Sequence, residues 1–83
     1  MTGRILYKSS VSRDLRKIAP KDVDRILSQI RMVLGEDPQS GEQLHGDFEG
    51  LLKLRIGDYR VVYALSGNDV VVLRIRHRSK AYH

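Results

Sequence analysis

Five basic side chains in the C-terminal part of the chain alternate with apolar residues. They are Lys53, Arg55, Arg60, Arg74 and Arg76. Successive side chains of a β-strand point to opposite faces, so alternate residues of one strand share a face. An arginine offers a planar fork of N–H donors that matches phosphate oxygens. A solvated outer face that discourages aggregation is the ordinary explanation for one such arginine. For five on one face we expect an anion-binding surface.

Cations gathered in this way have the chemistry needed to cleave RNA without a metal ion. Attack of a ribose 2′-hydroxyl on the adjacent phosphate needs a base, cations that stabilise the transition state, and an acid for the leaving 5′ oxygen. We expect Arg60 and Arg76 to face each other and to stabilise the charge. Arginine does not deprotonate in proteins. The base therefore stays open between Lys53 among its like charges, the imidazole of His77, and the phenol of Tyr82.

Other basic residues are expected to hold the RNA, and the sequence has no pattern of a metal or cofactor site. The expected RNA-binding residues are Arg55, Arg74, Arg78 and Lys80. The chain contains no cysteine, and its three histidines are not spaced as metal ligands. It also lacks the glycine-rich motifs that bind phosphate groups of nucleotides. We therefore expect no metal and no cofactor.

The elements that must position these residues follow from hydrophobic periodicity. A short strand at 4–8 precedes a helix that Ser9 and Ser10 would cap and that runs to about Lys17. Pro20 begins a second, amphipathic helix, which Gly35 is expected to end. After a connecting loop over 35–50, a period of two predicts three strands within 51–76, and 77–83 is a polar tail. We predict one α+β domain over residues 1–83, ordered β-α-α-β-β-β, with both helices packed on one face of an antiparallel sheet.

Turn lengths predict how these strands pair. A two-residue turn at Gly57-Asp58 places Arg55 opposite Arg60. A three-residue loop over 67–69 places Arg60 opposite Arg76, and an even loop would put Arg60 on the apolar face. In this register 71, 73 and 75 face the helices, and the five cations share the other face. Strict alternation puts His77 on the helix side, so it can serve the cationic face only if the strand ends or bulges there.

Charge and composition favour an anionic partner. The formal net charge is +5, and residues 51–83 hold seven basic and two acidic side chains. Such an excess favours nucleic acid, an acidic protein or a membrane surface as partner. The first residues are too short and mixed for a signal peptide, and no apolar stretch approaches the roughly 20 residues that span a bilayer. We expect a cytoplasmic protein that does not bind a membrane.

Two segments resemble the RelE/ParE toxin superfamily. Residues 52–63 (LKLRIGDYRVVY) resemble its lysine–x–arginine strand and the YRVVY-like strand that follows, and residues 74–82 (RIRHRSKAY) resemble its last strand and basic tail. The resemblance covers nearly the whole chain and implies a RelE-like fold. By position, the family's catalytic or substrate-binding residues match Lys53, Arg60, Arg76 and Tyr82, and His77 matches a histidine of many relatives. Where some relatives have a second lysine, this chain has Leu51.

The resemblance also implies a function and partners. It implies a toxin of a type II toxin–antitoxin system, which cleaves mRNA in the 30S ribosomal A site and so inhibits translation. A cognate antitoxin would neutralise it, and operator DNA would be bound only through the toxin–antitoxin complex. A ParE-like toxin that binds DNA gyrase without cutting RNA is the alternative, and an inert relative that binds only its partner is a third. The retained cations and Tyr82 favour the ribonuclease.

Overall fold

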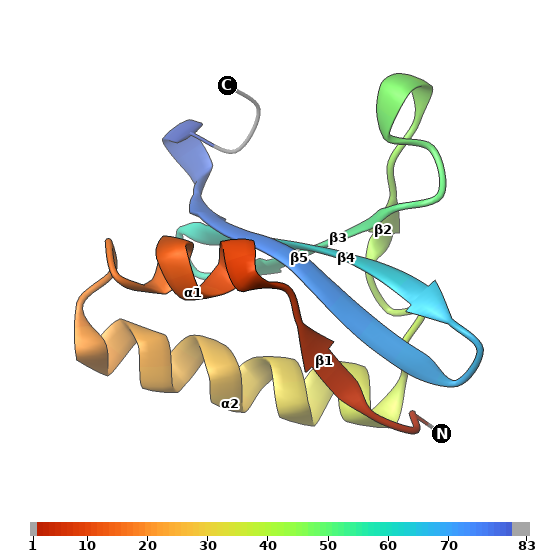
Figure 1. The fold of residues 1–83 in the computed structure, drawn as a ribbon, viewed down its shortest axis with the longest axis horizontal. Coiled ribbons are helices and arrows are strands. Elements are labelled where there is room, and N and C mark those ends of the chain that lie inside the picture. The colour runs from red at the N-terminus through yellow and green to blue at the C-terminus, as the bar shows by residue number, and fades with distance from the viewer. Residues whose placement is uncertain (1, 81–83) are drawn as a thin grey trace.

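The computed structural model describes residues 2–80 and contains two helices beside a five-stranded sheet (Figure 1). The chain order is β1 (Ile5–Tyr7), α1 (Ser9–Leu15), α2 (Pro20–Glu36), β2 (Glu42–Gln43), β3 (Leu52–Ile56), β4 (Tyr59–Ser66) and β5 (Asp69–His77). Two 3₁₀ turns, η1 (Gly46–Phe48) and η2 (Arg78–Lys80), follow β2 and β5. The predicted α+β class and element order are confirmed, with β2 as an additional short strand.

The sheet is mixed, and in this it differs from the expected antiparallel one. Its strand order is β1-β5-β4-β3-β2, and β1 runs parallel to β5, with Ile5 opposite Val70. A parallel pair needs a crossover connection, and two helices and three strands separate β1 from β5 along the chain. At the other edge Glu42 and Gln43 pair with β3 inside the segment that was expected to be a loop.

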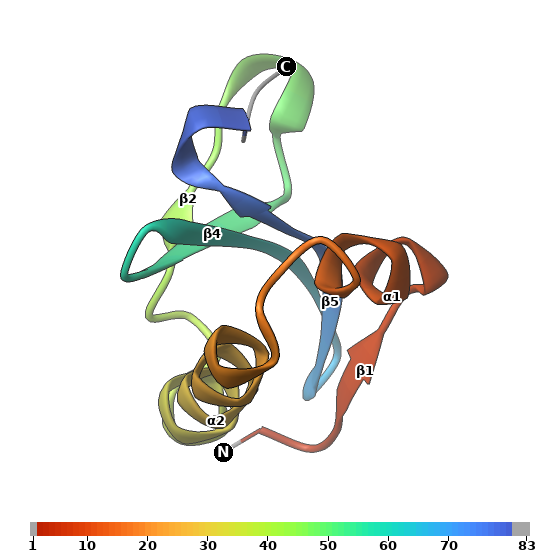
Figure 2. The same cartoon turned by 90° about the vertical axis from the view of Figure 1, so that its left-hand side faces the viewer.

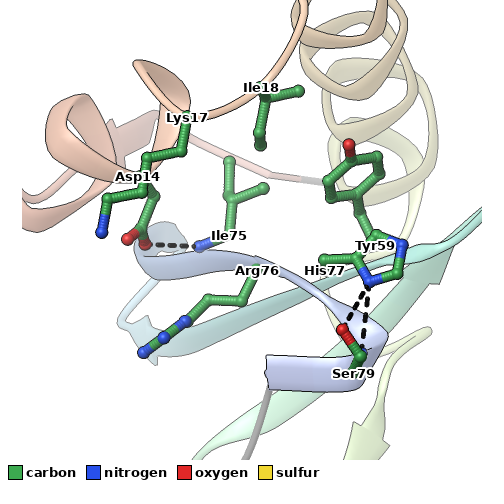
Figure 3. A pocket seen from close by; sticks show the side chains of 8 residues that line it. All are labelled: Asp14, Lys17, Ile18, Tyr59, Ile75, Arg76, His77 and Ser79. Atoms are coloured by element: carbon green, nitrogen blue, oxygen red, sulfur yellow. Dashed lines mark hydrogen bonds between the residues drawn. The ribbon is translucent and has the colours of Figure 1, made fainter.

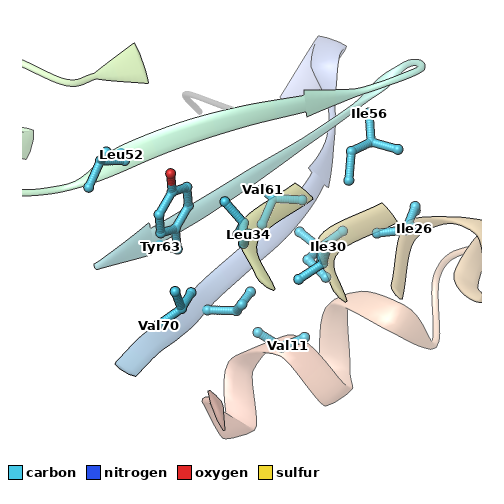
Figure 4. Close-up of a cluster of buried hydrophobic side chains, with 11 residues drawn as sticks. Val11, Ile26, Ile30, Leu34, Leu52, Ile56, Val61, Tyr63 and Val70 are labelled. Atoms are coloured by element: carbon cyan, nitrogen blue, oxygen red, sulfur yellow. The ribbon is translucent and has the colours of Figure 1, made fainter. Parts of the chain in front are cut away.

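The core lies between α2 and one face of the sheet (Figures 2 and 4). Ile26, Ile30 and Leu34 recur every four residues on α2 and are fully buried. Strands β4 and β5 meet them with five further side chains that are fully buried, Val61, Tyr63, Val70, Val72 and Ile75. Helix α2 continues through Gly35, where termination was expected, and ends at Glu36.

Helix α1 places Val11 in this core but lies along the edge of β5, next to the end of β1 (Figures 1 and 2). It is shorter than expected and ends at Leu15. Its N-cap is Lys8, so the predicted serine cap is wrong. The hydroxyl of Ser10 instead donates a 2.6 Å hydrogen bond to the carbonyl oxygen of Leu73. This bond ties α1 to β5.

A β-bulge corrects the predicted second hairpin. The turn has two residues, Gly67 and Asn68, because Ser66 pairs with Asp69, and Gly67 has φ +61°. Further along the ladder Val62 pairs with Arg74 and Tyr63 with Val72, so Leu73 is the extra residue in β5. Residues 70 and 72 therefore face the core, and the prediction of 71 and 73 is wrong. Beyond the bulge the predicted register holds.

Candidate functional site

The register brings the five predicted cations to one face of the sheet. Arg55 lies opposite Arg60, and Arg60 lies opposite Arg76. Lys53 and Arg74 both lie opposite Val62, on the same face. Helix α2 covers the other face, and η1 and η2 extend on the side away from α2 (Figure 1). We call the side away from α2 the outer face.

Arg74 is engaged by a carboxylate of the same chain. Its Nε and Nη2 atoms each donate a 2.9 Å hydrogen bond to the carboxylate of Asp14, which also accepts a 3.0 Å bond from the N–H of Ile75. Burial by itself would raise the pKa of Asp14, but the hydrogen bonds from Arg74 and Ile75 outweigh it, and the pKa lies below its ordinary value. The same carboxylate raises the pKa of Arg74. Arg74 thus holds α1 against β5, and its charge is balanced.

A second carboxylate reaches the outer face through β2. Glu42 lies opposite Lys53, with 3.5 Å between Oε2 and Nζ. Together with Arg55 and Arg60 they line a hollow of about 380 Å³. The outer face therefore carries a carboxylate as well as the five cations. Sequence reasoning missed Glu42 because a two-residue strand in a glycine-rich segment has no periodicity to read. The glutamate side chain is 74% exposed, whereas the lysine side chain is 21% exposed.

Arg60 and Arg76 form the centre of the outer face. They are directly opposed on β4 and β5, and both are partly buried. Within residues 2–80 no carboxylate lies within 4.0 Å of the Arg76 guanidinium. Like charges directly opposed in a sheet destabilise it.

His77 lies on the other side of the sheet from Arg76, as strict alternation predicted. It pairs with Tyr59, and the two rings meet edge to face with centroids 5.5 Å apart (Figure 3). The backbone N–H of Ser79 donates to Nδ1 of His77 at 3.3 Å, and Ser79 Oγ lies 2.9 Å from the same atom. Strand β5 ends at His77, but the structure does not bring its ring onto the outer face beside Arg60.

Two further predicted residues, Arg78 and Lys80, directly follow the end of β5. Arg78 is exposed, with its backbone N–H bound to the carbonyl of Asp58 and its Nε 3.9 Å from the Asp58 carboxylate. Lys80 ends η2. Tyr82 falls outside the described residues, so its predicted role stays a prediction.

The described residues offer no metal site and no membrane span. Over 2–80, no three histidine, aspartate or glutamate side chains come close enough together to hold a metal ion. None of the helices found there is both long and apolar enough to cross a bilayer.

Comparisons with known proteins agree with this geometry. Residues 5–82 match the family described as ParE toxin of the type II toxin–antitoxin system parDE. The chain is 34% identical over 81 residues to Toxin RelE of Mycobacterium tuberculosis, covering 94% of this chain and 84% of the relative. It is 27% identical to Toxin RelG of the same organism, covering 99% and 98%. Among solved structures, a chain of the M. tuberculosis RelBE2 toxin–antitoxin complex superposes with a TM-score of 0.87 at 26% identity, covering 94% of this chain and 100% of that one.

Proposed function

This chain belongs to the RelE/ParE superfamily of type II toxins, and from that membership we propose that it is a ribosome-dependent, metal-independent endoribonuclease that cleaves mRNA in the A site. The observation that carries the proposal is the placement of Arg60 opposite Arg76 on the outer face of the sheet. Guanidinium groups carried by two opposed residues can bind the scissile phosphate and stabilise the negative charge that develops on it during cleavage.

The outer face is the proposed location of this reaction. The 2′-hydroxyl loses its proton to a base, its oxygen bonds to phosphorus, and the bond to the 5′ oxygen breaks as that oxygen takes up a proton. Arg60 and Arg76 stabilise the phosphorane-like transition state. Lys53 shares their face, whereas His77 lies on the helix side. This placement favours Lys53 over His77 as the group that contacts the 2′-hydroxyl, with Tyr82 as the remaining candidate.

RNA binding around the reacting phosphate is assigned to the exposed basic side chains. Arg55 and Arg78 are both exposed. Arg55 lies opposite Arg60 on β3, and Arg78 follows Arg76 by two residues, directly after β5. Arg74 is a weaker candidate than the sequence pattern indicated, because Asp14 already accepts both of its hydrogen bonds. The engaged Arg74 supports the position of β5 instead.

A cognate antitoxin is the proposed protein partner. Solved structural neighbours include RelB–RelE complexes of Methanococcus jannaschii and Pyrococcus horikoshii, which show the shared fold bound to an antitoxin. We propose that such a partner neutralises this chain and that operator DNA is bound only by the complex. With a ribosomal substrate, the proposed location of the protein is the cytoplasm.

Inhibition of DNA gyrase without RNA cleavage is the second candidate function. The matched family is the ParE toxin family, and the balancing of Arg74 by Asp14 leaves the outer face less positive than five unpaired cations would be. A ParE-like function would need the fold but not the arginine pair. The two functions therefore differ in their dependence on Arg60.

Translating ribosomes with purified toxin test the choice. After incubation, primer extension maps the mRNA ends. We expect new ends within the A-site codon. Cleavage should need no divalent ion beyond the concentration that the ribosomes themselves require. Arg60→Ala should abolish them. Arg25→Ala removes an exposed arginine from α2 and is the matched control, with cleavage unchanged. Intact mRNA together with gyrase trapped on DNA would overturn the ribonuclease proposal.

A further inference from the structure

A hollow opens where α1 ends beside the last residues of β5 (Figure 3). It has a volume of about 420 Å³ and is lined by Asp14, Lys17, Ile18, Tyr59, Ile75, Arg76, His77 and Ser79. This volume falls within the range of roughly 300–1,000 Å³ that small-ligand sites occupy. The hollow exists because β1 covers β5 only as far as Val72, and α1 covers it only as far as Ile75. Within residues 2–80, neither β1 nor α1 pairs with the edge of β5 beyond that point.

We propose that this hollow binds the base of the nucleotide next to the phosphate held by Arg60 and Arg76. The inference rests on the proposed ribonuclease function, because it names a second contact of the same RNA strand. Arg76 belongs to the outer face by register and also lines the hollow, so it borders both places. An RNA strand that crosses the edge of β5 at Arg76 would leave its phosphate on the outer face and present the next base to the hollow.

The walls of the hollow suit an aromatic ring. Ile18 and Tyr59 are partly buried, so apolar surface remains accessible there, and Ile75 forms part of the lining. In the edge-to-face contact between Tyr59 and His77 the edge of one ring meets one face of the other, so His77 covers at most one face of Tyr59. Bases stack on aromatic faces in a manner that tolerates any sequence. Ser79 holds Nδ1 of His77, and this bond fixes the imidazole at the rim.

The charges around the hollow favour a nucleotide over a neutral ring. Lys17 and Arg76 line it together with His77, and Asp14 is the one acid among the residues that line it. Both oxygens of Asp14 already accept hydrogen bonds from Arg74 or Ile75, so its charge is balanced by Arg74. A phosphate near Lys17 and Arg76 therefore meets net positive charge.

Titration of the full chain with mononucleotides, followed by ¹H–¹⁵N NMR, tests the inference without ribosomes. The ligands are AMP, GMP, CMP and UMP, and ribose 5-phosphate is the matched ligand that lacks a base. We expect saturable shifts at Ile18, Tyr59, Ile75 and His77 with the nucleotides and none of comparable size with ribose 5-phosphate. Equal shifts with ribose 5-phosphate, or no shifts at millimolar nucleotide, would overturn the proposal.

Two variants assign the binding to the hollow. Tyr59→Leu keeps an apolar side chain but removes the stacking face, and the dissociation constant should rise roughly tenfold. Tyr7→Leu removes an exposed tyrosine from β1 and should leave the dissociation constant unchanged. The NMR spectrum of each variant reports whether the fold is retained. Loss of binding in both variants, or in neither, would contradict a stacking site at Tyr59.

Arg60→Ala separates failure of this proposal from failure of the proposed function. Arg60 is not among the residues that line the hollow, so mononucleotide binding should persist in a variant that no longer cleaves mRNA. A chain that cleaves mRNA but binds no mononucleotide refutes the base site alone. A chain that binds mononucleotides in the hollow but leaves mRNA intact refutes the ribonuclease and, with it, the assignment of this base to a cleaved strand.

Discussion

Arg74 donates two hydrogen bonds of 2.9 Å to the carboxylate of Asp14, which lies 60 residues earlier in the chain. The same carboxylate accepts a hydrogen bond from the backbone N–H of Ile75. The Asp14 side chain therefore joins α1 to β5 through both the Arg74 side chain and the backbone at the edge of the strand. The contact fixes the strand that carries Arg76 and engages the Arg74 guanidinium, so Arg74 is less available than Arg76 to an external anion.

Asp14→Ala should lower the free energy of unfolding by roughly 2–3 kcal/mol, because it leaves the Ile75 N–H and a partly buried guanidinium without their acceptor. Urea denaturation measures the change. Asp22→Ala removes the partner of Arg25 in an exposed pair on α2, and its effect should be at most about 1 kcal/mol. Equal effects for the two variants would contradict a special role for Asp14.

Acid should weaken the fold through the same carboxylate. The pKa of Asp14 is lower in the folded chain than its ordinary value of 3.8, so the unfolded chain binds more protons in the range between the two values. The stabilisation is complete above about pH 4 and is lost as the pH falls through the folded-state pKa. Unfolding followed from pH 6 to pH 2 should show this loss. The curve for Asp14→Asn should be flatter, and parallel curves would exclude Asp14 as its source.

The salt dependence of RNA binding should distinguish Arg76 from Arg74. A cation that contacts a phosphate releases counterions. Each lost contact therefore reduces the magnitude of the negative slope of log K (the association constant) against log salt by about 0.7 for a single strand. Arg76→Gln should show this decrease. Arg74→Gln should leave the slope unchanged, because its guanidinium is bound to Asp14. Fluorescence anisotropy with a short labelled RNA gives both slopes. A smaller slope in Arg74→Gln would show that the ion pair opens when RNA binds.

Replacement of Arg76 should separate charge from geometry in the cleavage reaction. Arg76→Ala should slow single-turnover cleavage on the ribosome by about 10²–10³-fold, as expected for loss of a donor to the transition state. Arg76→Lys keeps the charge without the planar fork, so part of this loss should remain. If lysine restored the full rate, the charge alone would be sufficient. A rate unchanged in both variants would remove Arg76 from the reacting centre.

Tyr63→Phe should destabilise the segment that carries Glu42. The buried hydroxyl donates to the carbonyl of Pro38 at 2.9 Å and accepts from the N–H of Gly41 at 3.0 Å, and the variant leaves both backbone groups unsatisfied. We expect a loss of about 1–3 kcal/mol in urea denaturation and faster amide exchange at Gly41. Tyr7→Phe removes a hydroxyl from an exposed ring and should change neither measurement.

Periodicity and turn chemistry determined most of the fold before any contact was known. A period near four predicted α2, and a period of two predicted the three long strands. The pairing of Arg60 with Arg76 was correct even though the loop that justified it was wrong. The reason is that the register beyond an irregularity depends only on how many extra residues precede it. The predicted loop had one extra residue in the turn, whereas the observed strand has one extra residue in the bulge at Leu73. Both arrangements give the same pairs from Arg74 onward.

Asp14 carried a partial signal in the sequence. It lies three residues after Val11 and directly before Leu15, within the apolar stripe of α1, where an acid needs a partner. Nothing local identifies that partner as Arg74. Glu42 carried no comparable signal, because its position opposite Lys53 exists only once β2 has paired with β3.

The sequence by itself thus determined that the five cations share a face, because side-chain direction repeats with a fixed period along a strand, although the bulge at Leu73 reversed the facing of residues 70–73. Only the tertiary structure decided which of these cations are balanced by acids, that β1 runs parallel to β5, and that a hollow opens beside His77. These features depend on distances between segments far apart in the chain. Such distances are set by the packing of the whole core and not by any local pattern.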